Sequence, residues 1–284
     1  MARRGFWLLG IAGVAAAALG LRVLWGHRAS RGAAGDPHRW PGQLSVLRPV
    51  ATRFTAEAGA IRVAIDPGHG APGNRGNTSS YCVEEQDAML ALGEAVAGRL
   101  QATGHVKVRL LRDAGHVVTY ADRVEEARAW GADAFVSLHS DVRGKLQRWS
   151  PAPGRDCPLS LDAPGFAILY SDEGDAALAS RRALLGRALA RRMIEAGFLP
   201  YDGAEYAGIY APDADERGVF ADRHAPEQRI FVLRRAAMPS ILVETHNAVD
   251  SREAARWTEP ATVDAFASAV AAALYDAIGV QRGT

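Results

Sequence analysis

The strongest constraint on the fold is an alternation of strand-like and helix-like segments, which runs from Ile61 to the end of the sequence. Short apolar runs with the length and β-branched content of buried strands cover residues 61–66, 106–112, 133–139, 166–171, 229–233 and 240–245. Longer stretches with apolar residues at helical spacing cover residues 86–102, 120–130, 176–196 and 260–278. This order predicts an α/β fold, with a mostly parallel twisted sheet of about six strands and helices on both faces, in a single domain.

Two segments interrupt this alternation. Residues 142–164 form an insertion rich in proline, glycine and serine. Residues 201–228 show neither the alternation of a strand nor the spacing of a helix. We predict that both are loops.

Composition limits the function classes that remain open. A chain of 284 residues with 48% hydrophobic residues can bury a full core. The formal net charge of +1, with no block of basic residues beyond the N-terminus, provides no surface for a polyanion. We therefore expect no nucleic acid partner.

The N-terminus has the layout of an export signal. Arg3 and Arg4 precede an apolar run from Phe6 to Leu21, which predicts a signal peptide. Two alternatives stay open: the stretch from Phe6 to Trp25 approaches the length of a membrane span, and the arginine pair resembles a twin-arginine signal. Either way, we expect a protein that works in the periplasm or cell envelope, and that touches the membrane only through this segment.

The domain boundaries follow from these features. Residues 1–28 are predicted to be an export signal or an inner-membrane anchor. Residues 29–60, rich in Gly, Pro, Arg and Ala, are predicted to be a flexible linker. Residues 61–284 make up the folded domain.

Three predicted strands end in side chains that can do chemistry. The segment "VAIDPGHG" ends in His69, "FVSLHSD" contains His139, and "ILVETHN" contains Glu244. Glu85 lies where a loop becomes a helix. The carboxyl ends of parallel strands meet at one edge of an α/β sheet, so we expect these four groups to converge there.

Two histidines and one carboxylate are a ligand set typical of catalytic zinc, which leaves a fourth position for water. A second carboxylate beside that water can take its proton and pass it to a leaving amine. The same ligands also accept Mn, Co or Fe. The pattern indicates hydrolysis of an amide or an ester.

Cys82 and Cys157 are the two cysteines of the chain, and both lie in predicted loops near this edge. In an exported protein they can form a disulfide, and the alternative is two unpaired small residues. Neither has a partner at short ligand spacing, which argues against metal binding by the cysteines.

Several segments together carry a resemblance to a known family. They are "VAIDPGHG", "EQDAML", "LLRD" with "ADRVEEA", "GADAFVSLHSD", "GFAILYS" and "VLRRAAMPSILVETHN". Their order resembles that of zinc-dependent N-acetylmuramoyl-L-alanine amidases, the bacterial cell-wall hydrolases of the amidase type 3 family, from about Ile61 to Ile278.

This resemblance implies one Zn²⁺ held by His69, Glu85 and His139, with Glu244 as the catalytic carboxylate. It also implies that the substrate is peptidoglycan, cleaved at the amide between N-acetylmuramic acid and L-alanine. Glu85 is chosen over Glu84 because the family's ligand precedes an x-Asp-x-x-Leu pattern, which residues 86–90 match. Glu84 remains the alternative.

Further residues fall near the family's site. Arg112, Arg123 and Asp141 do so. Arg123 can meet a carboxylate of the stem peptide, and a structural ion pair is the alternative for each of the three. His246 follows Glu244 closely enough to line the pocket. We take Arg123, Asp141 and His246 as candidate substrate-binding residues.

The sequence also departs from the family's pattern. Asp141 stands where the family usually has Asn, Thr245 and His246 replace Gly-Phe, and the insertion over residues 142–164 is longer than in the plainest members. Some relatives carry a segment that covers the site until a partner removes it. Residues 201–228 are where we would look for one, so a protein activator is a candidate partner.

Two alternatives to the amidase interpretation remain. One is a zinc peptidase or deacylase acting on another amide. The other is a catalytically inactive peptidoglycan-binding protein.

Overall fold

The computed structural model describes residues 45–52, 54 and 60–279. All of them belong to one compact unit that spans residues 35–284. The predicted export signal or anchor and most of the predicted linker lie outside the described residues. The boundaries at residues 28 and 60 therefore stay predictions.

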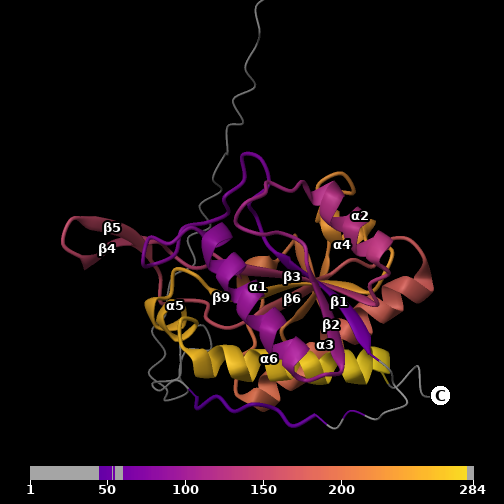
Figure 1. Ribbon diagram of the computed structural model, residues 1–284. Coiled ribbons are helices and arrows are strands. Elements are labelled where there is room, and N and C mark those ends of the chain that lie inside the picture. Colours follow the sequence, from indigo (N-terminus) through magenta and orange to yellow (C-terminus); the bar gives the residue numbers. More distant parts are fainter. Residues whose placement is uncertain (1–44, 53, 55–59, 280–284) are drawn as a thin grey trace, which may run out of the picture. The chain divides into compact units, whose positions relative to one another are not determined.

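The regular elements begin with strand β1, and strands and helices alternate as predicted as far as β3 (Figure 1). The strands are β1 (Ile61–Pro67), β2 (Val106–Leu110), β3 (Ala134–Asp141), β4 (Gln147–Ala152), β5 (Arg155–Leu159), β6 (Ala167–Tyr170), β7 (Tyr210–Pro212), β8 (Val219–Asp222) and β9 (Ser240–Asn247). The α-helices are α1 (Glu85–Ala102), α2 (Tyr120–Trp130), α3 (Ala176–Ala196), α4 (Phe231–Arg235), α5 (Ser251–Arg256) and α6 (Pro260–Leu274). A short 3₁₀ turn, η2 (Ala204–Tyr206), and a π-helical extension of α6, η3 (Tyr275–Gly279), complete the elements.

The central sheet has seven strands in the order β2-β1-β3-β9-β6-β8-β7. β2, β1, β3 and β9 are parallel, and the direction reverses between β9 and β6. β8 is parallel to β6, and the edge strand β7 is antiparallel to β8. The prediction of a mostly parallel α/β sheet is confirmed, with one strand more than expected.

Helices cover both faces of this sheet, as predicted. Val63 and Ile65 of β1 belong to a core cluster shared with α1, α3 and α6, whereas Ala64 of the same strand belongs to a second cluster shared with α2 and α4. This division follows from the period of two along a strand, which sends successive side chains to opposite faces. The sheet is therefore buried on both sides, as its continuous apolar strands require.

Two predictions about the second half of the chain were wrong. Residues 229–233 were expected to be a strand, but they lie in and before helix α4, whose Val232 and Leu233 pack in the same cluster as Val124 of α2. A short apolar run cannot be assigned to strand or helix from periodicity alone. The sheet positions are instead filled by β7 and β8, from the segment over residues 201–228 that was expected to be a loop.

Within the described part of the chain, one helical stretch is long and apolar enough to span a membrane. It is Pro260–Gly279, which comprises α6 and η3, and 72% of its most apolar window is buried inside the protein. Residues of α6 pack in the core cluster with α1 and α3, so this stretch is a core helix.

The insertion over residues 142–164 is not a plain loop, because it contains the antiparallel hairpin β4–β5. The hairpin extends away from the sheet (Figure 1) and is fixed at its base. The Trp149 indole N–H donates to the carbonyl of Ser80 at 2.7 Å, and a disulfide joins Cys82 to Cys157 with a Cα–Cα distance of 5.3 Å. The hairpin is thereby tied to the loop that precedes α1.

Candidate active site

Three of the predicted chemical groups meet at one edge of the sheet. His69 directly follows β1, His139 lies near the end of β3, and Glu85 is the first residue of α1. Each offers one ligand atom, and these atoms lie within 4.8 Å of one another. The convergence expected from the parallel strands is therefore present for His69, Glu85 and His139.

Hydrogen bonds from neighbouring residues fix the orientation of the His69 and Glu85 side chains. His69 Nδ1 lies 2.8 Å from Asn74 Oδ1, which leaves Nε2 to face the other two groups. Glu85 Oε2 accepts from the backbone N–H and the side-chain amide of Asn77, at 3.0 and 2.8 Å. Glu85 Oε1 accepts from the Ser140 N–H at 2.9 Å. Hydrogen bonds of this kind commonly orient the side chains that bind a metal.

The separations between the ligand atoms suit a zinc ion. His69 Nε2 lies 2.9 Å from Glu85 Oε2 and 3.0 Å from His139 Nδ1, and His139 Nδ1 lies 3.2 Å from Glu85 Oε1. Two ligand atoms about 2.0–2.1 Å from a tetrahedral zinc are separated by roughly 3.4 Å. Two imidazole nitrogens and one carboxylate oxygen at these distances fit such an ion with only small adjustments.

The electrostatics keep Glu85 ionised. Burial opposes its charge, but hydrogen bonds from His139 and His69 and their charges outweigh burial and lower the pKa of Glu85. Burial likewise opposes the charged form of His69, and the Glu85 carboxylate outweighs this and raises the pKa of His69. A carboxylate that stays charged in a buried position is a ready anionic ligand for a cation.

Glu84, the alternative ligand, lies outside this cluster. Its carboxylate pairs with Arg75 at 2.8 Å and accepts from the Gln86 side chain.

Glu244 lies beside the three groups. It is paired with His139 in the register of β3 and β9, and both residues line the same pocket. Burial, then the charges of Asp141 and Glu85, raise the pKa of Glu244 well above its usual range. Its Oε2 atom is shielded from solvent and has no hydrogen-bond partner among the described residues. Such a carboxylate has a high affinity for a proton and an oxygen available to take one.

Asp141 also lines the pocket. Its Oδ2 accepts from the Tyr206 hydroxyl at 2.5 Å and lies 3.4 Å from Nε of Arg143. The negative charge that replaces the family's usual Asn is thus met by a buried guanidinium and a phenol.

The pocket around these groups, here called the catalytic pocket, has a volume of about 540 Å³. Its polar wall comes from the loop before α1 and from the ends of β3 and β9. Its apolar wall is formed by Tyr120, Val142, Tyr210, Ile230, Phe231, Val232 and Leu242.

Arg123 does not reach this pocket. Its side chain is 0% exposed and pairs with Asp66 at 2.9 Å. Of the two roles considered for Arg123, the structure shows the structural ion pair.

His246 also lies elsewhere, on the side of the sheet away from Glu244. The pairing of β3 with β9 shifts by one residue between His139/Glu244 and Asp141/Asn247, which marks a β-bulge. A bulge inserts one residue and reverses the faces that follow. His246 therefore packs against Trp257, with ring centroids 5.4 Å apart, and lines a different cavity.

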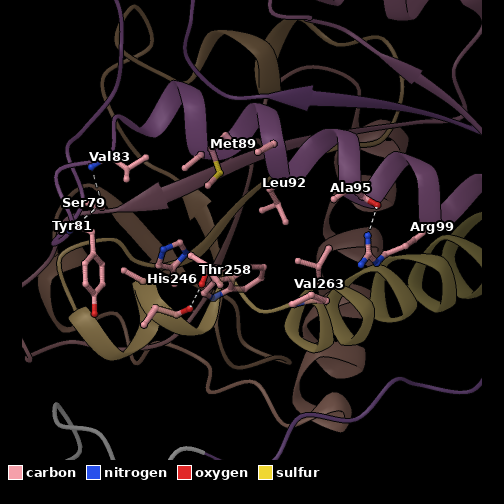
Figure 2. A pocket seen from close by; sticks show the side chains of 16 residues that line it. Ser79, Tyr81, Val83, Met89, Leu92, Ala95, Arg99, His246, Thr258 and Val263 are labelled. Carbon is pink, nitrogen blue, oxygen red and sulfur yellow. Dashed lines mark hydrogen bonds between the residues drawn. The ribbon is translucent and has the colours of Figure 1, made fainter.

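That second cavity, here called the apolar groove, has a volume of about 710 Å³ (Figure 2). It lies between α1, with Met89 and Leu92 pointing into it, and the α5–α6 region, which contributes Thr258 and Val263. Tyr81 and Val83, on either side of Cys82, line its end near the hairpin. The groove and the catalytic pocket have no lining residue in common.

Sequence reasoning missed several residues that line the catalytic pocket or hydrogen-bond to its lining. Asn74 and Asn77 lie in the glycine-rich loop between β1 and α1, and Tyr206 and Tyr210 come from the segment over residues 201–228. For Asn74 and Asn77, the available signal was their position in the sequence between His69 and Glu85. Nothing local marked the tyrosines, whose position depends on the pairing of β7 and β8.

A family model and several known proteins match this chain. Residues 63–276 match the Amidase_3 family model, described as N-acetylmuramoyl-L-alanine amidase. A curated relative, the sporulation-specific N-acetylmuramoyl-L-alanine amidase of Bacillus subtilis (strain 168), is 28% identical over 191 residues, which cover 65% of this chain and 55% of that protein. Across the curated relatives that it matches, the aligned part spans between 19% and 55% of their length.

Solved structures show the same fold. The amidase AmiC2 of Nostoc punctiforme is 27% identical, with a TM-score of 0.51 over 76% of this chain and 96% of that one. The amidase Ami1 of Mycobacterium smegmatis, at 21% identity, has a TM-score of 0.60 over 79% of this chain and 99% of that one. Since the family model covers most of the sequence and the fold agrees, this chain belongs to the N-acetylmuramoyl-L-alanine amidase family.

Proposed function

We propose that this protein is a zinc-dependent hydrolase that cleaves the amide between N-acetylmuramic acid and L-alanine in peptidoglycan. The observation that supports this most is the convergence of the His69, Glu85 and His139 ligand atoms, beside Glu244, in a chain of the amidase family. His69, Glu85 and His139 would hold the metal. When bound, the zinc supplies Lewis-acid polarisation of the scissile carbonyl and acidifies a water.

Glu244 acts as the general base and then as the general acid. Its unpartnered Oε2 takes a proton from the attacking water and delivers it to the leaving nitrogen of L-alanine. The position of Glu244 favours this role, because its Oε2 has no hydrogen-bond partner among the described residues and Glu244 lines the same pocket as His69, Glu85 and His139.

The same proposal also concerns the location and the partners of the protein. Peptidoglycan lies outside the cytoplasm, so the protein is exported, and the basic and apolar N-terminus is the proposed signal or anchor. A protein activator stays a candidate partner. The zinc peptidase or deacylase and the inactive wall-binding protein remain the competing interpretations.

The test is digestion of purified peptidoglycan by zinc-loaded protein from Gly35 onward, the compact unit that contains the domain. Released fragments are identified by mass spectrometry, and we expect free stem peptides that begin with L-alanine. Glu244→Gln should lower the rate of release by about 10²- to 10⁴-fold while zinc binding is retained. Glu94→Gln, which changes an exposed carboxylate on α1, is the matched control and should act as wild type.

Other results would redirect the proposal. Peptides cut at another bond would favour the peptidase interpretation. Wall binding without any release, by wild-type protein that carries zinc and has been tested with cell-envelope extract as a source of activator, would favour the binding protein.

A further inference from the structure

The loop that carries His69 has a backbone that needs external support. His69 and Gly70 follow one another with φ of 61° and 70°, both in the left-handed region. A residue with a side chain seldom occupies this region, and it does so where its surroundings dictate the conformation. Besides the hydrogen bonds with Asn74, two arginines that do not line the catalytic pocket support this loop.

These arginines donate to three successive carbonyls of the loop. Arg112 donates to Pro67 O from Nε at 3.2 Å and to Gly68 O from Nη2 at 3.3 Å. Arg123 donates to Pro67 O at 3.2 Å and to His69 O at 2.6 Å. The carbonyls from Pro67 to His69 are thereby all oriented toward buried guanidinium groups.

Arg112 also contacts the element that carries Glu85. Its Nη2 donates to the carbonyl of Gln86, in the first turn of α1, at 2.6 Å. One guanidinium thus joins the chain next to His69 to the chain next to Glu85. Gly70 makes room for it, because a Cβ at that position would lie 2.9 Å from the Arg112 guanidinium carbon.

We propose that Arg112 is a positioning residue for the metal site, which sets the separation of His69 from Glu85 by hydrogen-bonding to both of their chain segments. The inference rests on the proposed function, because it takes these residues as metal ligands. These hydrogen bonds of Arg112 all go to backbone carbonyls, so it acts on the ligands through the backbone.

The chain offers a matched control in Arg182. Arg182 is 1% exposed and Arg112 is 7% exposed. Arg182 likewise donates to three backbone carbonyls, those of Ser171, Glu173 and Ala236, at 3.3, 3.0 and 2.9 Å. It lies on α3, outside the catalytic pocket.

The experiment compares Arg112→Lys with Arg182→Lys in the full chain. Lysine keeps the charge, but one ammonium cannot reproduce the planar fork that spans three carbonyls. Zinc affinity is measured by competition with a chromophoric chelator, and the Co²⁺ absorption spectrum reports ligand geometry. Thermal unfolding of the metal-free proteins measures the loss of stability in each.

We expect Arg112→Lys to weaken zinc affinity by about 10- to 100-fold and to alter the Co²⁺ spectrum. Arg182→Lys should leave both at the wild-type value, although its unfolding temperature falls. Equal losses of zinc affinity in the two variants, or no loss in either, would overturn the inference. Wild-type protein that bound no zinc would overturn the proposed function and this inference with it.

A second pair of variants serves if Arg112→Lys does not fold. Gly70→Ala places a methyl group against the Arg112 guanidinium, whereas Gly73→Ala, at φ of 78° and with nothing within 4 Å, adds similar backbone strain without that contact. Weaker zinc binding in Gly70→Ala than in Gly73→Ala supports the role of Arg112. Equal binding in the two contradicts it.

Discussion

The catalytic pocket and the apolar groove both take lining residues from one stretch of chain, residues 74–99, yet they are built in different ways. The pocket gathers polar groups from three separate elements and orients them with hydrogen bonds. The groove is lined mainly by apolar side chains of α1 and the α5–α6 region. Changes in the pocket should therefore appear in metal binding and catalysis, and changes near the groove in stability.

The largest contrast should come from His139→Ala, which removes one of the three ligands. We expect peptidoglycan release to fall by at least about 10³-fold, because a lost ligand removes a charge stabilisation of several kcal/mol. The unfolding temperature of the metal-free protein should fall only modestly, since Glu85 loses its contact with His139 but keeps its donors from Asn77 and Ser140. His116→Ala, at an exposed histidine, is the control. A large loss of stability in the metal-free His139→Ala protein would break the comparison.

The next prediction concerns the disulfide, whose Cys82 lies between two residues that line the apolar groove. Replacing Cys82 and Cys157 together by serine should lower the free energy of unfolding by about 2–4 kcal/mol, because the bond closes a long loop in the unfolded chain. Zinc affinity should stay the same, since Ser80 N–H still donates to Ala248 O and Glu85 N–H to Asn77 O, each at 2.9 Å. Denaturant titration and chelator competition measure the two quantities. A fall in zinc affinity would show that the hairpin helps to shape the catalytic pocket.

The smallest expected effect concerns His246, on the groove side. Burial, together with the charge of Arg143, lowers the pKa of His246 to about 3. The unfolded chain, with a histidine pKa of about 6.5, binds more protons between these values, so stability is complete above about pH 6.5 and falls as the pH is lowered.

His246→Phe keeps the ring against Trp257 and removes this titration. Between pH 7 and pH 5, wild type should lose about 2 kcal/mol more stability than the variant. Denaturant unfolding at both pH values checks this. Identical pH dependence in the two proteins would mean that the loss of stability arises elsewhere.

The sequence was sufficient for the parts of the pocket that depend on regular structure. Parallel strands must deliver their carboxyl ends to one edge, so residues 69, 139 and 244 were predicted together from three separated motifs. Helices α2 and α3 also have the predicted bounds, because their apolar spacing is clear and a glycine follows each.

The remainder depended on contacts between residues far apart in the chain. The bulge that turns His246 away from Glu244 arises from the pairing of β3 with β9. No local sequence pattern predicts it. Arg123 is separated by 57 positions from Asp66, the carboxylate that holds it. Helix α4 was taken for a strand because its apolar run is short, and its packing in one cluster with Val124 of α2 is a contact between distant residues.

The reversal of direction between β9 and β6 has a consequence for how relatives of this protein can diverge. His139 of β3 and Ala167 of β6 both lie opposite Glu244, so β3 ends at the edge of the sheet where β6 begins. The connection between them, residues 142–166, returns to that edge without the crossover that a parallel neighbour would need. Both ends of this connection stay at the edge that carries Glu244, whatever its length, whereas its middle, the β4–β5 hairpin, extends away from the sheet (Figure 1). A change in the length of the hairpin therefore adds or removes chain outside the sheet and its helical layers.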